Sequence, residues 1–298
     1  MKKILALLLC SLALTANAKE TINIIYGFSA GDNVANYARN LAEEANKIQD
    51  KYQFTFDVKS GAGQVVAVNY VKNTPNTIFM TSGAYWVRPN FYPNESYDVH
   101  EFRTIMTQCS IPFAVASSKF ASWKDVPTDR PLTVGTSGLG VVSHLTAVQL
   151  QTRYPKITVV PFKSTTDALV AAAGGQIDFG IGFLGDLAHW SEGGKLNILG
   201  TTGPKPVGGY PNLSGQGFPA VLSKMNSMHN LMVPKSWSDA KAHEIREILV
   251  KAENTRSVRI AYNLDYCEPV QIPENKLQSW FDDQNSTWTS LTKGVKIN

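Results

Sequence analysis

Hydrophobic and polar positions along the chain form two alternating patterns, short apolar runs and longer stretches with helical periodicity. Residues 21–26 (TINIIY) predict a strand, and residues 34–48 place apolar side chains on one face of a helix that Asp32 or Asn33 can cap. The same succession of strand, turn and helix recurs along the chain. This order is expected of a parallel α/β sheet.

The pattern continues to the C-terminus and suggests two domains. The other predicted strands are residues 54–58, 77–81, 113–117, 132–135, 157–162, 177–181 and 196–201. The other predicted helices are residues 65–71, 143–152, 166–173, 185–191, 237–251 (with Ser238 as a cap) and 277–291. Residues 204–219 are rich in Pro and Gly and predict a surface crossing. We expect one domain of residues 19–107 plus 226–298, with a second domain of residues 108–225 inserted into it.

The first 18 residues have the pattern of a secretory signal peptide. Lys2 and Lys3 precede an apolar run, and Ala16 and Ala18 form an A-x-A site that predicts cleavage after Ala18. The apolar run is about 11 residues, well short of the roughly 20 that span a bilayer. Leu9 before Cys10 argues against a lipoprotein. We therefore expect a soluble, exported protein, and the short signal suits a bacterial periplasm.

Charge and cysteine content narrow the function classes. Without Lys2 and Lys3 the chain carries 26 basic and 24 acidic residues in no clustered basic run, which disfavours a nucleic-acid partner. Cys109 and Cys267 permit one disulfide without requiring it. Neither cysteine lies among histidines with metal-ligand spacing, so we expect no metal site and no cofactor.

Three glycine- and serine-containing turns follow predicted strands: residues 27–31 (GFSAG), 81–85 (TSGAY) and 136–140 (TSGLG). Glycine lets the backbone come close to a ligand, and the amides at a helix start carry a partial positive charge. In an open α/β sheet such turns lie together at the carboxyl ends of the strands. They can therefore hold a carboxylate or phosphate without a catalytic side chain.

The GFSAG turn also matches the G-x-S-x-G nucleophile elbow, with Ser29 as the nucleophile. His144, His189, His229 or His243, with Asp178 or Asp186, would complete the triad. However, Ser29 follows the first strand of the exported chain, whereas a hydrolase elbow follows several strands, and no upstream glycine cluster offers an oxyanion hole. A Ser29 esterase or hydrolase is thus the less favoured alternative.

Several longer segments resemble one known family in order and context. These segments are INIIYGFSAGDNVANYARNLAEEANK, SGAGQVVAVNYV, TSGLGVVSHLTAVQL, VVPFKSTTDALVAAAGGQIDFGIG and GGKLNILGTTGPKP. Together they resemble the periplasmic solute receptors of tripartite tricarboxylate transporters, the Bug family. The likeness spans nearly the whole exported chain.

The resemblance implies an α/β, two-domain periplasmic binding protein of the Venus flytrap, type II-like class, with a ligand cleft between the domains. Such a protein is not an enzyme: it captures a small organic carboxylate and delivers it to membrane permease subunits, and we expect a monomer. The resemblance implies two jaws at residues 28–33 and 137–144 and side walls at residues 81–85 and 161–163. The ligand-binding residues it implies are Phe28, Ser29, Ala30, Gly31, Asn33, Thr81, Ser82, Gly83, Tyr85, Thr136, Ser137, Gly138, Ser143, His144, Lys163 and Phe183. A binding protein for another transporter or for a two-component sensor is the alternative.

The chain departs from the family at two positions that bear on the ligand. The Thr-Asp pair common in the first jaw falls on Val34 and Ala35, and a polar pair of the second domain falls on Gly182 and Phe183. Both changes predict a less polar ligand body. A shortened region between Ser122 and Pro131 is expected to alter surface shape only.

Overall fold

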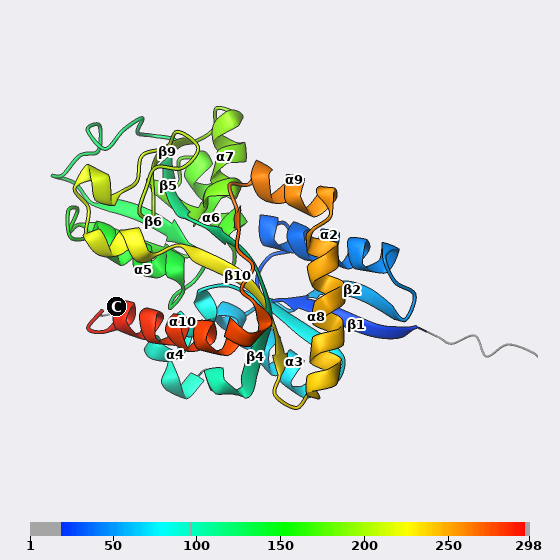
Figure 1. The fold of residues 1–298 in the computed structure, drawn as a ribbon. Helices are drawn as coiled ribbons and strands as arrows, with labels where there is room; N and C mark the ends of the chain where they lie inside the picture. Colours follow the sequence, from blue (N-terminus) through cyan, green and yellow to red (C-terminus); the bar gives the residue numbers. More distant parts are fainter. Residues whose placement is uncertain (1–18, 96, 296–298) are drawn as a thin grey trace, which may run out of the picture.

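Two β-sheets organise the protein into two lobes that lie side by side (Figure 1). The computed structural model describes residues 19–95 and 97–295. The expected signal peptide, residues 1–18, lies outside the described residues. We call the part built on the six-stranded sheet the first lobe, and the part built on the five-stranded sheet the second lobe.

The sheet of the first lobe has the strand order β11-β4-β10-β3-β1-β2. Its strands are β1 (Glu20–Tyr26), β2 (Tyr52–Val58), β3 (Thr77–Thr81), β4 (Phe102–Ile111), β10 (Ser227–Pro234) and β11 (Glu268–Pro269). Its helices are α2 (Asn33–Lys47), α3 (Val65–Asn73), α4 (Ala84–Phe91), α8 (Asp239–Glu253), α9 (Arg256–Leu264) and α10 (Leu277–Thr292). Only β1, β2 and β3 pair in parallel, whereas β10 and β11 run antiparallel to their neighbours. The sheet is therefore mixed, and the expected parallel order holds for its first three strands.

The sheet of the second lobe has the order β7-β6-β8-β5-β9. Its strands are β5 (Phe113–Ser117), β6 (Leu132–Thr136), β7 (Ile157–Pro161), β8 (Phe179–Phe183) and β9 (Asn197–Thr201), and its helices are α5 (Val142–Leu150), α6 (Thr165–Ala173) and α7 (Leu184–Glu192). Strand β6 pairs in parallel with β7 and β8, while β5 is antiparallel to β8 and β9. Short 3-10 helices complete both lobes: Ala62–Gln64, Pro93–Glu95, Val99–Glu101, Ser214–Gln216, Ala220–Lys224 and Glu274–Lys276.

The chain crosses between the lobes twice. Strand β4 ends at Ile111 and β5 begins at Phe113, so the first crossing is a single residue, Pro112. The chain returns to the first lobe where β10 begins at Ser227. Strand β4 runs without interruption through positions 107 and 108, where the sequence pattern suggested a domain boundary.

Local sequence explains most of the elements. Ser238 caps α8 as expected, because its side chain accepts a hydrogen bond from the Lys241 amide. Asp32 occupies the N-cap position of α2, but its side chain makes no capping bond there. Helix α4 has no amphipathic pattern because its first five residues are all buried, and it packs through Trp86 against Trp280 and Phe281.

Cys109 on β4 and Cys267, the residue before β11, form a disulfide. The sequence left this pairing open. The pairing of β11 with β4 brings the two cysteines together although 158 residues separate them. Within the described residues, no helix combines the length and the apolar character needed to cross a membrane.

Candidate ligand-binding site

The cleft between the lobes holds two neighbouring cavities. The inner cavity has a free volume of about 20 Å³ and is lined by Tyr26, Phe28, Asp32, Ser82, Ala84, Phe113, Ser137, Val141, Val142, Ser143, Thr165 and Phe183. The outer cavity has about 440 Å³ and is lined by Gly27, Phe28, Ser60, Gly61, Ala62, Gly63, Arg88, Ser137, Gly138, Leu139, Phe162 and Lys163. Phe28 from the first lobe and Ser137 from the second line both cavities. The two cavities therefore adjoin at these two residues.

Hydrogen bonds across the cleft hold the lobes against each other. They join the Asn33 amide to Asp186 Oδ1 (3.1 Å), Thr166 Oγ1 to Asp32 Oδ1 (3.3 Å), His189 Nε2 to Asp265 Oδ1 (3.1 Å) and Arg88 Nη1 to the Leu139 carbonyl (3.1 Å). In each pair, one residue belongs to each lobe. The two lobes are therefore in direct contact around the inner cavity.

Asp32 brings a buried carboxylate to the inner cavity. Its Oδ2 accepts hydrogen bonds from the Tyr26 hydroxyl and the Ser29 amide, both at 3.2 Å. Burial raises the pKa of Asp32 to about 6, and these hydrogen bonds oppose the shift. Burial together with the charge of Asp32 also raises the pKa of Asp186. A carboxylate from Asp32 thus lines the first side of the cavity, whereas Val34 and Ala35 are not among the lining residues.

Serine hydroxyls and the start of α5 form the second side of the inner cavity. The Ser137 amide donates to Ser143 Oγ at 3.2 Å, and the two hydroxyls lie 3.0 Å apart. Gly138 has φ +122°, a left-handed conformation that favours glycine, and no atom lies within 4 Å of where its Cβ would be. These hydroxyls can hydrogen-bond a carboxylate at the partly positive end of the helix.

The site residues predicted from the sequence divide into two groups. Those that line a cavity are Phe28, Ser82, Ser137, Gly138, Ser143, Lys163 and Phe183. Those that line neither cavity are Ser29, Ala30, Gly31, Asn33, Thr81, Gly83, Tyr85, Thr136 and His144. Several of the second group form hydrogen bonds to nearby backbone groups.

Three residues of the second group make hydrogen bonds within their own lobe. The Tyr85 hydroxyl donates to the Val99 carbonyl at 2.9 Å, and its ring lies in the core of the first lobe. His144 Nδ1 accepts from the Gly140 amide at 3.0 Å, and burial lowers the pKa of His144 to about 4, which keeps the ring neutral near pH 7. Thr136 Oγ1 donates to the Gly138 carbonyl at 2.9 Å and fixes the second turn.

Sequence reasoning missed other lining residues. In the inner cavity these are Tyr26, Phe113 and Thr165, and in the outer cavity residues 60–63 and Arg88. The remaining lining residues lie within the expected jaws, side walls and glycine turns. The glycine turn at residues 60–64 was a visible signal, since such turns approach ligands closely. No signal in the sequence pointed to Arg88, because it lies in a helix that the periodicity did not predict.

The groups considered for other chemistry do not assemble a reactive centre. Ser29 Oγ accepts from the Gly31 amide at 3.2 Å, and within the described chain no histidine is among its hydrogen-bond partners. Cys109, His229 and Cys267 lie together, but the two sulfurs are bonded to each other. His243, Glu247 and Glu274 form an exposed cluster away from the cleft. No observation favours the hydrolase alternative.

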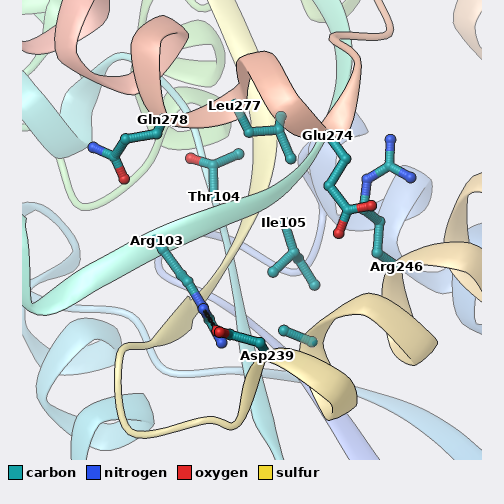
Figure 2. A pocket seen from close by; sticks show the side chains of 9 residues that line it. Arg103, Thr104, Ile105, Asp239, Arg246, Glu274, Leu277 and Gln278 are labelled. Atoms are coloured by element: carbon teal, nitrogen blue, oxygen red, sulfur yellow. Dashed lines mark hydrogen bonds and ion pairs between the residues drawn. The ribbon is translucent and has the colours of Figure 1, made fainter.

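A third cavity, of about 300 Å³, lies on the first lobe between β4, α8 and α10 (Figure 2). We call it the outer-face pocket. Arg103 there forms an ion pair with Asp239, and Arg246 Nη1 lies 2.9 Å from Glu247 Oε1. Glu274 lies 2.9 Å from His243 Nδ1. The charged groups at this pocket thus have partners within the protein.

Two α/β lobes that are joined by two crossings and meet around a small cavity define a binding protein of the two-lobed periplasmic class. The model of the tripartite tricarboxylate transporter family receptor matches residues 37–296. The chain therefore belongs to this family of solute-binding receptors. No curated protein sequence matches the chain.

Solved structures share this fold across their length. The periplasmic binding protein BugD superposes with a TM-score of 0.84 at 20% identity, covering 92% of this chain and 97% of that one. An R. palustris protein solved with adipate gives 0.83 at 20% identity, covering 93% and 97%. MatC from Rhodopseudomonas palustris, with bound malate, gives 0.80 at 17% identity, covering 92% and 99%. At these identities the likeness establishes the fold.

Proposed function

We propose that the protein captures a small organic carboxylate between its two lobes and delivers it to the membrane permease of a tripartite tricarboxylate transporter. The observation that carries the proposal is the inner cavity between the lobes, where the Ser137 and Ser143 hydroxyls lie together at the start of α5. Donors at a helix start favour an anion that is bound without chemical change. Such binding requires no nucleophile or base among the residues that line the inner cavity.

The ligands of the relatives support the same class. The structures described above include one with adipate and one with malate, both small dicarboxylates. Their binding residues do not transfer at such low identity, but their ligands agree with the donors that this chain places around its cavity. The family's receptors work in the periplasm, which agrees with the signal peptide expected at residues 1–18.

We propose further that the two lobes move as the domains of a Venus flytrap. In this proposal the first hinge is Pro112, between β4 and β5, and the second lies just before Ser227. Only two chain crossings connect the lobes, so a hinge motion needs backbone rotation at few residues. Opening would break the four hydrogen bonds that cross the cleft.

Ligand-dependent stabilisation tests the proposal. A ligand that binds only the folded protein raises the unfolding free energy, by about 2.7 kcal/mol at a concentration of 100 times Kd. We expect a panel of carboxylates that includes adipate and malate to contain acids that raise the melting temperature, and their neutral diamides to have no effect. If the diamides stabilise the protein as well as the acids do, carboxylate capture is wrong. Uptake of the same acid by cells with and without the receptor gene tests delivery to the permease.

A further inference from the structure

Arg88 is a buried charge without a counter-ion in the described protein. Its residue is only 8% exposed, and none of the ion pairs formed by the described side chains includes it. Among the described residues its Nε has no hydrogen-bond partner. Its one hydrogen bond goes from Nη1 to the Leu139 carbonyl across the cleft, and its guanidinium lies 4.3 Å from the centre of the Tyr92 ring.

A guanidinium in such surroundings requires compensation. Removing a charge from water is costly unless an opposite charge and further hydrogen bonds replace the water. One neutral carbonyl and one aromatic ring supply only part of that compensation. The planar fork of arginine matches a carboxylate with two parallel hydrogen bonds. A carboxylate from outside the protein would therefore complete the environment of Arg88.

The outer cavity brings Arg88 within reach of a ligand. Arg88 lines this cavity from the first lobe and Lys163, which is exposed, lines it from the second. The turn at Gly63 lies directly against Arg88, since a Cβ on that glycine would come within 3.1 Å of Arg88 Nη1. No acidic residue is among the residues that line the outer cavity. The cavity is thus electropositive and large enough for a carboxylate group.

We infer that the outer cavity is a second anion subsite in which Arg88, assisted by Lys163, binds a carboxylate at the far end of the ligand. The inference rests on the proposed function, and it specifies the ligand class as a dianionic acid that extends past Phe28 and Ser137. One acid group would bind at the Ser137 and Ser143 hydroxyls, and the other would lie against Arg88. Because Arg88 also bonds Leu139 of the second lobe, the second carboxylate would bind where the lobes meet.

The test compares each diacid with a ligand of the same length that lacks one charge. Calorimetry measures the affinity of the wild type for succinate, glutarate, adipate and pimelate, and for the monoamide of each. The variants are Arg88→Gln, Arg88→Lys, Lys163→Gln and, as a control with the same change in net charge, Arg103→Gln in the outer-face pocket. Thermal unfolding checks that each variant is folded.

We expect the wild type to bind its best diacid ten- to a hundredfold more tightly than the corresponding monoamide. Arg88→Gln should remove this preference, so that the variant binds the diacid and the monoamide with the same affinity. Arg88→Lys should keep part of the preference because it retains the charge but not the fork. Lys163→Gln should weaken diacid binding two- to fivefold, and this exposed variant still tests the subsite if Arg88→Gln does not fold. Arg103→Gln should change neither affinity.

Two results would overturn the inference while leaving carboxylate capture intact. One is a wild type that binds the monoamide as tightly as the diacid. The other is an Arg88→Gln variant that loses both ligands equally, which would show that Arg88 serves closure or holds the only carboxylate. If the wild type binds no carboxylate of any kind, the proposed function fails and the inference fails with it.

Discussion

The outer-face pocket and the outer cavity of the cleft both contain buried or half-buried arginines. The arginines of the two places differ in whether a carboxylate of the protein pairs with them. In the outer-face pocket Arg103 pairs with Asp239 and Arg246 pairs with Glu247 (Figure 2). At the cleft Arg88 has no carboxylate among the described side chains, although it is the most deeply buried of the three. The comparison indicates that a pocket whose charged side chains pair with one another needs no ligand. A buried charge without a partner in the protein indicates that a ligand of opposite charge binds there.

The largest effect on ligand affinity is expected from a bulky side chain at position 137, where the inner and outer cavities adjoin. Ser137→Trp places a large ring where Phe28 and Ser137 meet, so carboxylate affinity should fall at least a hundredfold, or roughly 3 kcal/mol. Ser137 is only half-buried, so the melting temperature should change little. The matched control is Gln278→Trp, which fills the outer-face pocket instead.

Calorimetry and thermal unfolding of the two variants decide the outcome. Unchanged affinity in Ser137→Trp would mean that the ligand does not pass between Phe28 and Ser137. A comparable loss in Gln278→Trp would show that the two regions are not functionally distinct.

A smaller effect concerns the pH dependence of the unfolding free energy, which compares the buried Asp32 of the cleft with the exposed Asp239 of the outer-face pocket. Burial raises the pKa of Asp32 to about 6, above its value in the unfolded chain, so the folded state favours the protonated form. Its stabilising contribution is complete below about pH 4 and is lost as the pH rises through 6. Between pH 7 and pH 5 the unfolding free energy should therefore gain about 1 kcal/mol from this residue.

Denaturant unfolding from pH 5 to pH 8 measures this dependence. Asp32→Asn should reduce the dependence by about this amount, and Asp239→Asn, at a side chain that is 94% exposed, serves as the surface control. The remaining dependence should come from other buried carboxyls with raised pKa values: Asp186, Asp265 and Glu253, whose pKa burial raises to about 7. An equally steep profile in Asp32→Asn would assign the whole dependence to these groups.

The smallest effect concerns stability without ligand. Arg88→Met removes an unpaired buried charge and keeps a side chain of similar length, so the unfolding free energy should rise by about 1 kcal/mol. Arg103→Met breaks an ion pair whose acidic partner is exposed, so it should lower the unfolding free energy by less than about 1 kcal/mol. Denaturant unfolding gives both values. If Arg88→Met is the more destabilising of the two, the bonds to Leu139 and Tyr92 already compensate the charge.

The amino-acid sequence by itself determined the local elements and the family resemblance. Strands β3 and β5 begin and end where the apolar runs at residues 77–81 and 113–117 predict, because such runs reflect a local preference. Strand β8 lies two residues later than predicted, at Phe179–Phe183. Asp178, the residue before β8, accepts a hydrogen bond from the Thr133 amide at 2.9 Å. Thr133 lies on the neighbouring strand β6, so the local sequence could not predict this contact.

Only the tertiary structure decided which side chains meet in the cleft. Tyr85 and Arg88 lie three residues apart on α4, yet Tyr85 enters the core and Arg88 lines the outer cavity. Strands β4 and β10 escaped the pattern analysis because they are almost wholly buried and show no alternation. Their antiparallel pairing carries the chain between the lobes, and the pairing of β4 with β11 brings Cys109 to Cys267. Local periodicity reports how a residue sits in its own element, whereas a counter-ion missing from Arg88 becomes visible only when residues distant in sequence are packed together.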